Sequence, residues 1–148
     1  MELIKTNEEL VEVCKSISKE KFITIDTEFI REKTYWSKLC LIQVCTHDKE
    51  IIIDPLENDI DLTPFIKILN KKSILKVLHS GRQDIEIFYK ISGKIPKPIF
   101  DTQIAAMVCG FGESVGYEKL VDKTLNKKID KSSRFSNWAK RPLTKKQL

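Results

Sequence analysis

FITIDTEF, residues 22–29, is the stretch of sequence that decides the fold. Apolar and polar residues alternate along it, and Ile, Thr and Phe favour extended structure, so it predicts a strand. Successive side chains of a strand point to opposite faces. The odd positions therefore form an Ile-rich face suited to a core, and the even positions form a second face that ends in Asp26 and Glu28.

Other periodic stretches flank this strand. An apolar stripe at helical spacing predicts a helix over residues 7–20, and Thr6 and Glu9 have the spacing of a capping box at its start. Ser80 and Gln83 have the same spacing at the start of a later helix. Strands that alternate with helices predict an α/β domain with a mixed sheet. The further strands are expected at residues 39–46, 50–54 and 75–79, and the further helices at residues 62–69, 80–91, 102–109 and 117–125.

The composition fits one globular domain. The chain has 148 residues, and its apolar runs are far shorter than the ~20 residues that a membrane-spanning helix needs. The N-terminus lacks a signal layout, and the four cysteines show no CxxC spacing, so we expect reduced thiols and a cytoplasmic location. The absence of P-loop, GxGxxG, HExxH and GxSxG motifs argues against nucleotide sites, zinc hydrolases and esterases.

The charge is unevenly distributed along the chain. There are 26 Lys and Arg against 21 Asp and Glu, a formal net charge of +5. Residues 119–148 carry ten Lys or Arg and two Asp, whereas the rest of the chain has a small acidic excess. This basic stretch indicates either a polyanionic partner, of which nucleic acid is the commonest, or a solubilising tail.

Asp26 and Glu28 share a strand face, about 6–7 Å apart at their Cα atoms. Like charges held this close are costly unless a cation joins them, and oxygen-only ligands select Mg²⁺ or Mn²⁺. The alternative is a solvent-facing pair at the sheet edge. Asp84, in the first turn of a helix, either faces this pair or complements the helix dipole. Asp101 is explained as the N-cap of the next helix.

At four places the sequence resembles the ribonuclease D family of DEDD-type 3′–5′ exonucleases. DTEF at residues 26–29 resembles the first exonuclease motif, and LHSG at residues 78–81 with Asp84 resembles the second. FDTQ at residues 100–103 and WAKRPL at residues 138–143 extend the match. Each motif alone is weak, but together, in this order, they cover essentially the whole chain.

The resemblance implies a ribonuclease H-like α/β fold, with a mixed five-stranded sheet and helices on both faces. It implies phosphodiester hydrolysis with two divalent ions, Mg²⁺ or Mn²⁺, held by the catalytic residues Asp26, Glu28 and Asp84. The implied substrate is RNA with a single-stranded 3′ end, such as a tRNA precursor. A DNA-directed 3′–5′ exonuclease is the alternative.

Five residues near these motifs are expected to contact the substrate. Aromatic rings between cations suit single-stranded nucleic acid. Two alternatives stay open: the aromatic pair closes a hairpin by packing, and the histidine is structural. The five residues are Thr27, Arg31, Tyr35, Trp36 and His79.

The family's third motif carries a Tyr and an Asp on a helix, and by its spacing it would fall beyond Leu148. We therefore expect residues 1–148 to form an exonuclease domain that is incomplete at its C-terminus. This domain would lack its last helix and a helical RNA-binding domain. The chain alone would then be weakly active or inactive, a nucleic-acid-binding fragment of the same fold. An apolar surface left by the missing helix would favour self-association.

Overall fold

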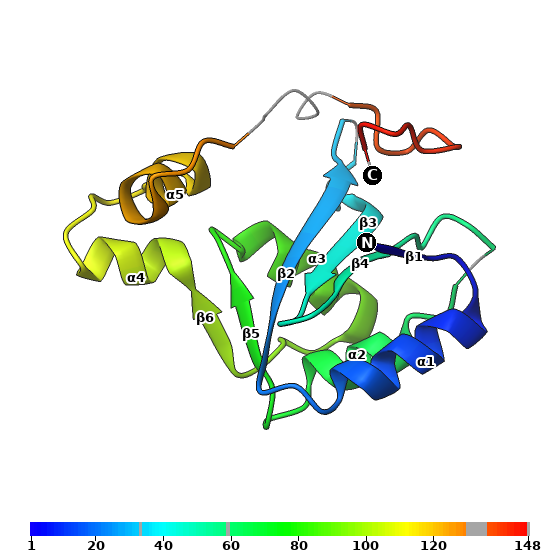
Figure 1. The fold of residues 1–148 in the computed structure, drawn as a ribbon. Coiled ribbons are helices and arrows are strands. Elements are labelled where there is room, and N and C mark those ends of the chain that lie inside the picture. The colour runs from blue at the N-terminus through cyan, green and yellow to red at the C-terminus, as the bar shows by residue number, and fades with distance from the viewer. Residues whose placement is uncertain (33, 59, 130–135, 148) are drawn as a thin grey trace.

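The computed structural model describes residues 1–32, 34–58, 60–129 and 136–147. Within these residues six strands form one mixed sheet in the order β1-β4-β3-β2-β5-β6, accompanied by five helices (Figure 1). None of these helices is long and apolar enough to cross a membrane. The strands are β1 (Glu2–Ile4), β2 (Phe22–Ile30), β3 (Lys38–Cys45), β4 (Glu50–Ile53), β5 (Leu75–Leu78) and β6 (Ile99–Asp101). The helices are α1 (Asn7–Ile17), α2 (Thr63–Leu69), α3 (Arg82–Ser92), α4 (Thr102–Val108) and α5 (Tyr117–Leu125).

Strand β2 runs through the middle of the sheet, as its alternating sequence predicts. It pairs antiparallel with β3 and parallel with β5. Its odd positions are buried up to Thr27, and its even positions are exposed up to Asp26. A register shift between Glu28 and Phe29 marks a β-bulge against β3. Because a bulge re-aims side chains, the regular alternation ends beside the two carboxylates.

The Ile-rich face of β2 packs against three helices. Side chains of α1, α2 and α3 share one hydrophobic core with this face. The rings of Phe65 in α2 and Phe88 in α3 lie 6.2 Å apart within it. Helix α1 begins with the predicted capping box, in which the Glu9 backbone N–H donates to Thr6 Oγ1 at 3.2 Å. These helices close one face of the sheet and leave the Asp26 face to the site.

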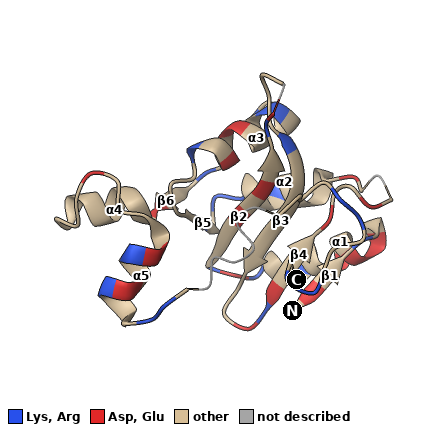
Figure 2. Cartoon of the chain, turned by 90° about the horizontal axis from the view of Figure 1, so that it is seen from above, with Lys and Arg blue, Asp and Glu red and all other residues tan. Residues whose placement is uncertain are grey.

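The sheet has one strand more than the five that the resemblance implies. Strand β1 pairs in parallel with β4, and β6 adds a short strand beside β5. Segments of three residues are too short to show a period-2 pattern, which explains why neither strand was predicted. Helix α5 lies on the side of the sheet opposite α3, next to the β5–β6 edge (Figure 2). Among the described residues, no helix packs over the middle of this second face.

Residues 136–147 cross one end of the second face and are held there by a buried ion pair. Arg141 donates to both carboxylate oxygens of Asp54, each at 2.6 Å. It also donates to the carbonyl oxygen of Trp138 at 2.8 Å. The Asp54 side chain is fully buried at the end of β4, and Trp138 packs with Leu41 in a second apolar cluster. The pair therefore ties the end of the chain to the sheet.

Candidate active site

The second face of β2 ends in the two predicted carboxylates. Asp26 is exposed and Glu28 is half-buried. Protein atoms that crowd the Asp26 carboxyl, together with the charge of Asp84, raise its pKa to about 6, although the Thr27 backbone N–H donates to its Oδ1 at 3.0 Å. Burial and the charges of Asp26 and Asp84 raise the pKa of Glu28 to about 7. Both groups lie where negative charge is disfavoured without a cation.

Asp84, in the first turn of α3, supplies a third carboxylate and is buried. The Thr27 hydroxyl donates a hydrogen bond to Asp84 Oδ1. Burial raises the pKa of Asp84, and the Thr27 bond opposes that rise. Thr27 is expected to contact substrate, and its side chain is buried and donates to Asp84. The reason is its odd place in β2, which directs it toward the helical side of the sheet.

The turn between β5 and α3 places Asp84, and Asp101 holds that turn. The Asp101 carboxylate accepts hydrogen bonds from the backbone N–H groups of Ser80 at 3.0 Å and Gly81 at 2.9 Å. It also caps α4 through the N–H of Gln103 at 2.8 Å, as predicted. These bonds outweigh its burial and lower the pKa of Asp101. The capping box predicted at Ser80 is wrong, because Gly81 is the N-cap of α3 and makes no side-chain bond.

The three carboxylates have no cationic partner in the described part of the chain. No ion pair there joins a Lys or Arg to Asp26, Glu28 or Asp84. No three His, Cys, Asp or Glu side chains of the described residues stand ready as a metal-binding group. The three carboxylates are thus a loose set of oxygen donors with raised pKa values. Oxygen donors of this kind suit a hard divalent cation.

His79, just after β5, lies beside Asp26 on the second face. Both line a cavity of about 380 Å³ that Tyr117 also borders. Thr102 Oγ1 is 2.9 Å from His79 Nδ1 and 3.1 Å from the carbonyl oxygen of Leu78. The single hydroxyl proton goes to the carbonyl, so His79 Nδ1 carries the hydrogen and donates it. Nε2 is buried and without a partner among the described residues.

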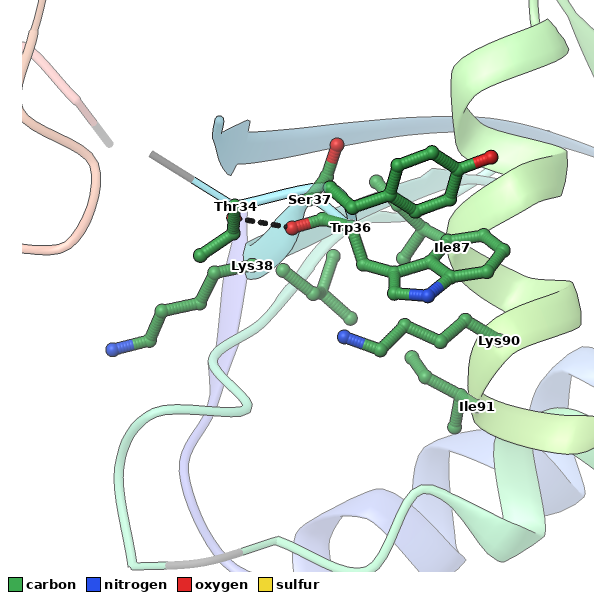
Figure 3. A pocket seen from close by; sticks show the side chains of 9 residues that line it. Thr34, Trp36, Ser37, Lys38, Ile87, Lys90 and Ile91 are labelled. Atoms are coloured by element: carbon green, nitrogen blue, oxygen red, sulfur yellow. Dashed lines mark hydrogen bonds between the residues drawn. The ribbon is translucent and has the colours of Figure 1, made fainter. Parts of the chain in front are cut away.

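Arg31, Tyr35 and Trp36 lie in the loop between β2 and β3, and they face α3 instead of the His79 cavity. The rings of Tyr35 and Trp36 meet edge to face at 5.1 Å between centroids, and their residues are 79% and 42% exposed. Figure 3 shows Trp36 turned toward α3, with Ile87 and Lys90 beside it. The residues expected to contact substrate therefore form two groups, one on the second face and one along α3.

Comparison with known proteins gives this geometry a family. A family model described as 3′–5′ exonuclease matches residues 1–148. The chain belongs to the 3′–5′ exonuclease family. The exonuclease domain is 49% identical over 148 residues to a ribonuclease D of Bartonella henselae, a match that spans 100% of this chain and 36% of that protein.

Solved structures agree with this assignment of the exonuclease domain. Escherichia coli RNase D, titled an exoribonuclease involved in structured RNA processing, has a TM-score of 0.93 and 38% identity over 98% of this chain. The match spans 38% of that chain. A Trypanosoma brucei RNase D in complex with RNA U12 has a TM-score of 0.85 at 19% identity, over 97% of this chain and 55% of that one. At that identity the likeness concerns the fold alone.

Three residues of this candidate site were not predicted from the sequence. Asp101 holds the α3 turn in addition to capping α4, and a cap is all that its local sequence indicates. Gln43 lies opposite Asp26 in the β2–β3 register and lines the His79 cavity with Tyr117. The alternation of β3 would have identified Gln43 only once its pairing with β2 was known.

Proposed function

We propose that this chain is the catalytic domain of a metal-dependent 3′–5′ exoribonuclease of the ribonuclease D type, which removes 3′ nucleotides from RNA such as tRNA precursors. The observation that carries the proposal is that Asp26, Glu28 and Asp84 have raised pKa values, that the charge of Asp84 contributes to the rise at Asp26 and Glu28, and that none of the three has a described cationic partner. The identity to ribonuclease D along the whole chain supports RNA as the substrate.

Mg²⁺ or Mn²⁺ fits this site because its donors are carboxylates, and oxygen ligands select hard divalent cations. Asp26, Glu28 and Asp84 would hold the metal, as two ions if the family resemblance applies in full. Bound ions of this kind activate water and stabilise the charge that develops on the phosphate and on the leaving oxygen. The cation would also favour the charged form of all three carboxyls, which the protein alone disfavours.

The chain's own side chains prepare the site for a terminal nucleotide. Thr27 holds Asp84 beside the β2 carboxylates through its hydrogen bond. The cavity next to Asp26, at about 380 Å³, falls within the range of small-molecule sites. His79 lines this cavity, and its buried Nε2 has no hydrogen-bond partner among the described residues. We assign His79 to substrate contact on this basis.

The partner that fits best is the single-stranded 3′ end of an RNA. Exposed Tyr35 and Trp36 beside Arg31 give the mixture of aromatic and cationic groups that single strands need. Cytoplasmic location accords with four free cysteines, because reducing compartments keep thiols unpaired.

A second candidate function is that of a nucleic-acid-binding fragment of the same fold. The observation that favours the second candidate, a nucleic-acid-binding fragment with little turnover, is the second face of β2, which no described helix covers. That face would also favour self-association, and light scattering that finds a monomer at high concentration would contradict this part of the proposal.

Trimming of a 5′-labelled single-stranded RNA tests the proposed activity. We expect products shortened from the 3′ end in Mg²⁺ or Mn²⁺, and none in EDTA. The Asp26→Asn variant should produce none, whereas the control Asp48→Asn, in the exposed turn between β3 and β4, should match the wild type. A single-stranded DNA of the same sequence distinguishes a DNA-directed enzyme.

Equal trimming by the wild type and Asp26→Asn would contradict the proposed site, since a contaminating nuclease would then explain the products. No trimming by the wild type, with RNA still bound, would favour the binding fragment. A chimera that continues the chain past Leu148 with the corresponding residues of a ribonuclease D relative would then be expected to restore trimming.

A further inference from the structure

A second groove lies outside the carboxylate site, along the outward side of α3. This α3 groove has a volume of about 500 Å³. Arg82 and Tyr89 of α3 are seven residues apart, so they lie on one stripe of the helix, roughly 10 Å apart along its axis. Asp84 is buried on another side of the same helix. The residues of the groove used below are Arg31, Tyr35, Trp36, Arg82, Tyr89 and Ile95.

Core packing does not account for the large apolar side chains of the α3 groove. Tyr35, Tyr89 and Ile95 are 79%, 49% and 56% exposed. Clusters of exposed apolar groups around one hollow mark interaction sites. The Thr34 hydroxyl donates to the Trp36 carbonyl oxygen at 2.6 Å, which braces the loop that carries Tyr35 (Figure 3). The groove therefore presents aromatic rings on a braced loop and on a helix.

The charges of the α3 groove suit a polyanion. Arg31 and Arg82 are both exposed at its border. Glu86, the acid that also lines it, is paired with Arg82 at 3.2 Å. An exposed pair of this kind contributes little, so the Arg82 guanidinium is free to exchange it for a phosphate, which binds arginine in a bidentate manner. Aromatic rings flanked by arginines match single-stranded nucleic acid better than a neutral protein surface.

We propose that the α3 groove binds the single strand upstream of its 3′-terminal nucleotide, with Tyr89 and Tyr35 stacking on bases and Arg82 contacting a phosphate. The inference rests on the proposed function and deepens it, since it gives the substrate a path and a minimum length. Arg31 follows Glu28 by three residues and Arg82 precedes Asp84 by two, so one end of the groove lies within a few residues of two of the carboxylates along the chain. At 3.4 Å per stacked nucleotide, roughly 10 Å of groove holds about three nucleotides.

Binding of 5′-fluorescein oligoribonucleotides in EDTA tests this path without any cleavage. The probes are a dinucleotide, too short to reach Tyr89, and an octanucleotide. Tyr89→Ala should weaken octanucleotide binding by about 5- to 150-fold, the equivalent of the loss of one stacked base, and leave dinucleotide binding unchanged. Tyr89→Phe, which keeps the ring, should bind both probes as the wild type does. Val11→Ala removes another exposed apolar side chain, on α1, and serves as the matched control.

A second variant tests the charge. Arg82→Gln should reduce the slope of octanucleotide affinity against salt concentration by about one phosphate contact. Octanucleotide binding by Tyr89→Ala that equals the wild type, or equal weakening of both probes, would overturn the proposal and leave the groove to a protein partner. Failure of the proposed function looks different: length-dependent binding would persist while no metal-dependent trimming occurs.

Discussion

At the scale of single residues, the site depends on three consecutive side chains of β2 that point to alternate faces. Asp26 and Glu28 point to the second face, while Thr27 points the other way and donates to Asp84. One short stretch of strand therefore supplies two carboxylates and positions the third. The alternation that buries Ile25 in the core also directs Asp26 and Glu28 to the other face. One sequence pattern therefore determines both the core and the position of the carboxylates.

Thr27→Val is predicted to impair the site with little loss of folding stability. Valine fills the same buried space but removes the hydroxyl whose bond lowers the pKa of Asp84, so that pKa should rise. A hydrogen bond to a charged group is commonly worth about 1.5–3 kcal/mol. We expect about tenfold slower trimming at pH 7 and a pH–rate profile displaced to higher pH. Thr24→Val, on the opposite face of β2, should leave the pH–rate profile unchanged. Unchanged profiles in both variants would contradict the role of Thr27 in positioning Asp84.

The raised carboxyl pKa values predict how the stability of the metal-free chain depends on pH. The pKa rises from 3.8 to about 6 for Asp26 and from 4.5 to about 7 for Glu28. Between about pH 4 and 7 the unfolded chain has lost these protons while the folded chain keeps them, so the free energy of unfolding falls as pH rises. Urea denaturation in EDTA should show this fall in the wild type and a smaller one in the Asp26→Asn, Glu28→Gln double variant. Parallel curves for the two proteins would refute the shifts.

At the scale of elements, the β5–α3 turn determines where Asp84 stands. Asp101, from the end of β6, accepts from two backbone N–H groups of the turn, and Ser80 takes a left-handed φ of 56° within it. Gly81 then lies so close to Leu78 that a Cβ would come within 2.7 Å of that side chain. Two neighbouring strands and a helix are thus joined at the point where the third carboxylate enters the site.

Gly81→Ala is predicted to destabilise this turn and the site together. The added methyl group would meet the Leu78 side chain, and overpacking of this kind costs about 1–3 kcal/mol. Gly116→Ala is a close control, since both glycines are N-caps with φ near −75° (−76° and −72°) and the control position has open space around it. Thermal denaturation measures both variants. The free energy of unfolding should fall for Gly81→Ala and stay within about 0.5 kcal/mol of the wild type for Gly116→Ala. Equal effects of the two substitutions would contradict the packing argument.

At the scale of the whole molecule, three helices close one face of the sheet and the site occupies the other. Residues 136–147 lie across one end of that second face, and the buried Arg141–Asp54 pair holds them there. This long-range contact joins positions 87 residues apart. The pair thus ties residues 136–147 to the end of β4.

Arg141→Met is predicted to cost about 3–5 kcal/mol of unfolding free energy, because it leaves the Asp54 charge buried and unpaired. Arg82→Met removes an arginine from an exposed pair on α3 and should cost less than about 1 kcal/mol. Urea denaturation of both variants measures the difference. Similar losses in the two would show that the Asp54 pair contributes no more than a surface contact.

Periodic patterns could be predicted from the sequence, and contacts between distant segments could not. The alternation of β2 placed Asp26 and Glu28 on one face. Two interpretations of Asp84 stayed open in the sequence, and its hydrogen bond with Thr27 was visible only in the fold. Strand β1 escaped prediction because three residues show no period. The Ser80 capping box failed because Asp101, distant in sequence, takes its backbone N–H. The Asp54–Arg141 pair had no local signal, since each residue alone looks like an ordinary surface charge.

Titration of the protein with Mn²⁺ at pH 6.5 tests the central claim, that three carboxylates form a site for a divalent cation. Calorimetry in two buffers of different ionisation enthalpy reports both binding and proton release. We expect the wild type and Asp48→Asn to bind Mn²⁺ and release protons, because the raised pKa values leave the carboxyls partly protonated at that pH. Asp26→Asn should lose most of this binding. Identical titrations of Asp26→Asn and the wild type would show that Asp26 belongs to no cation site.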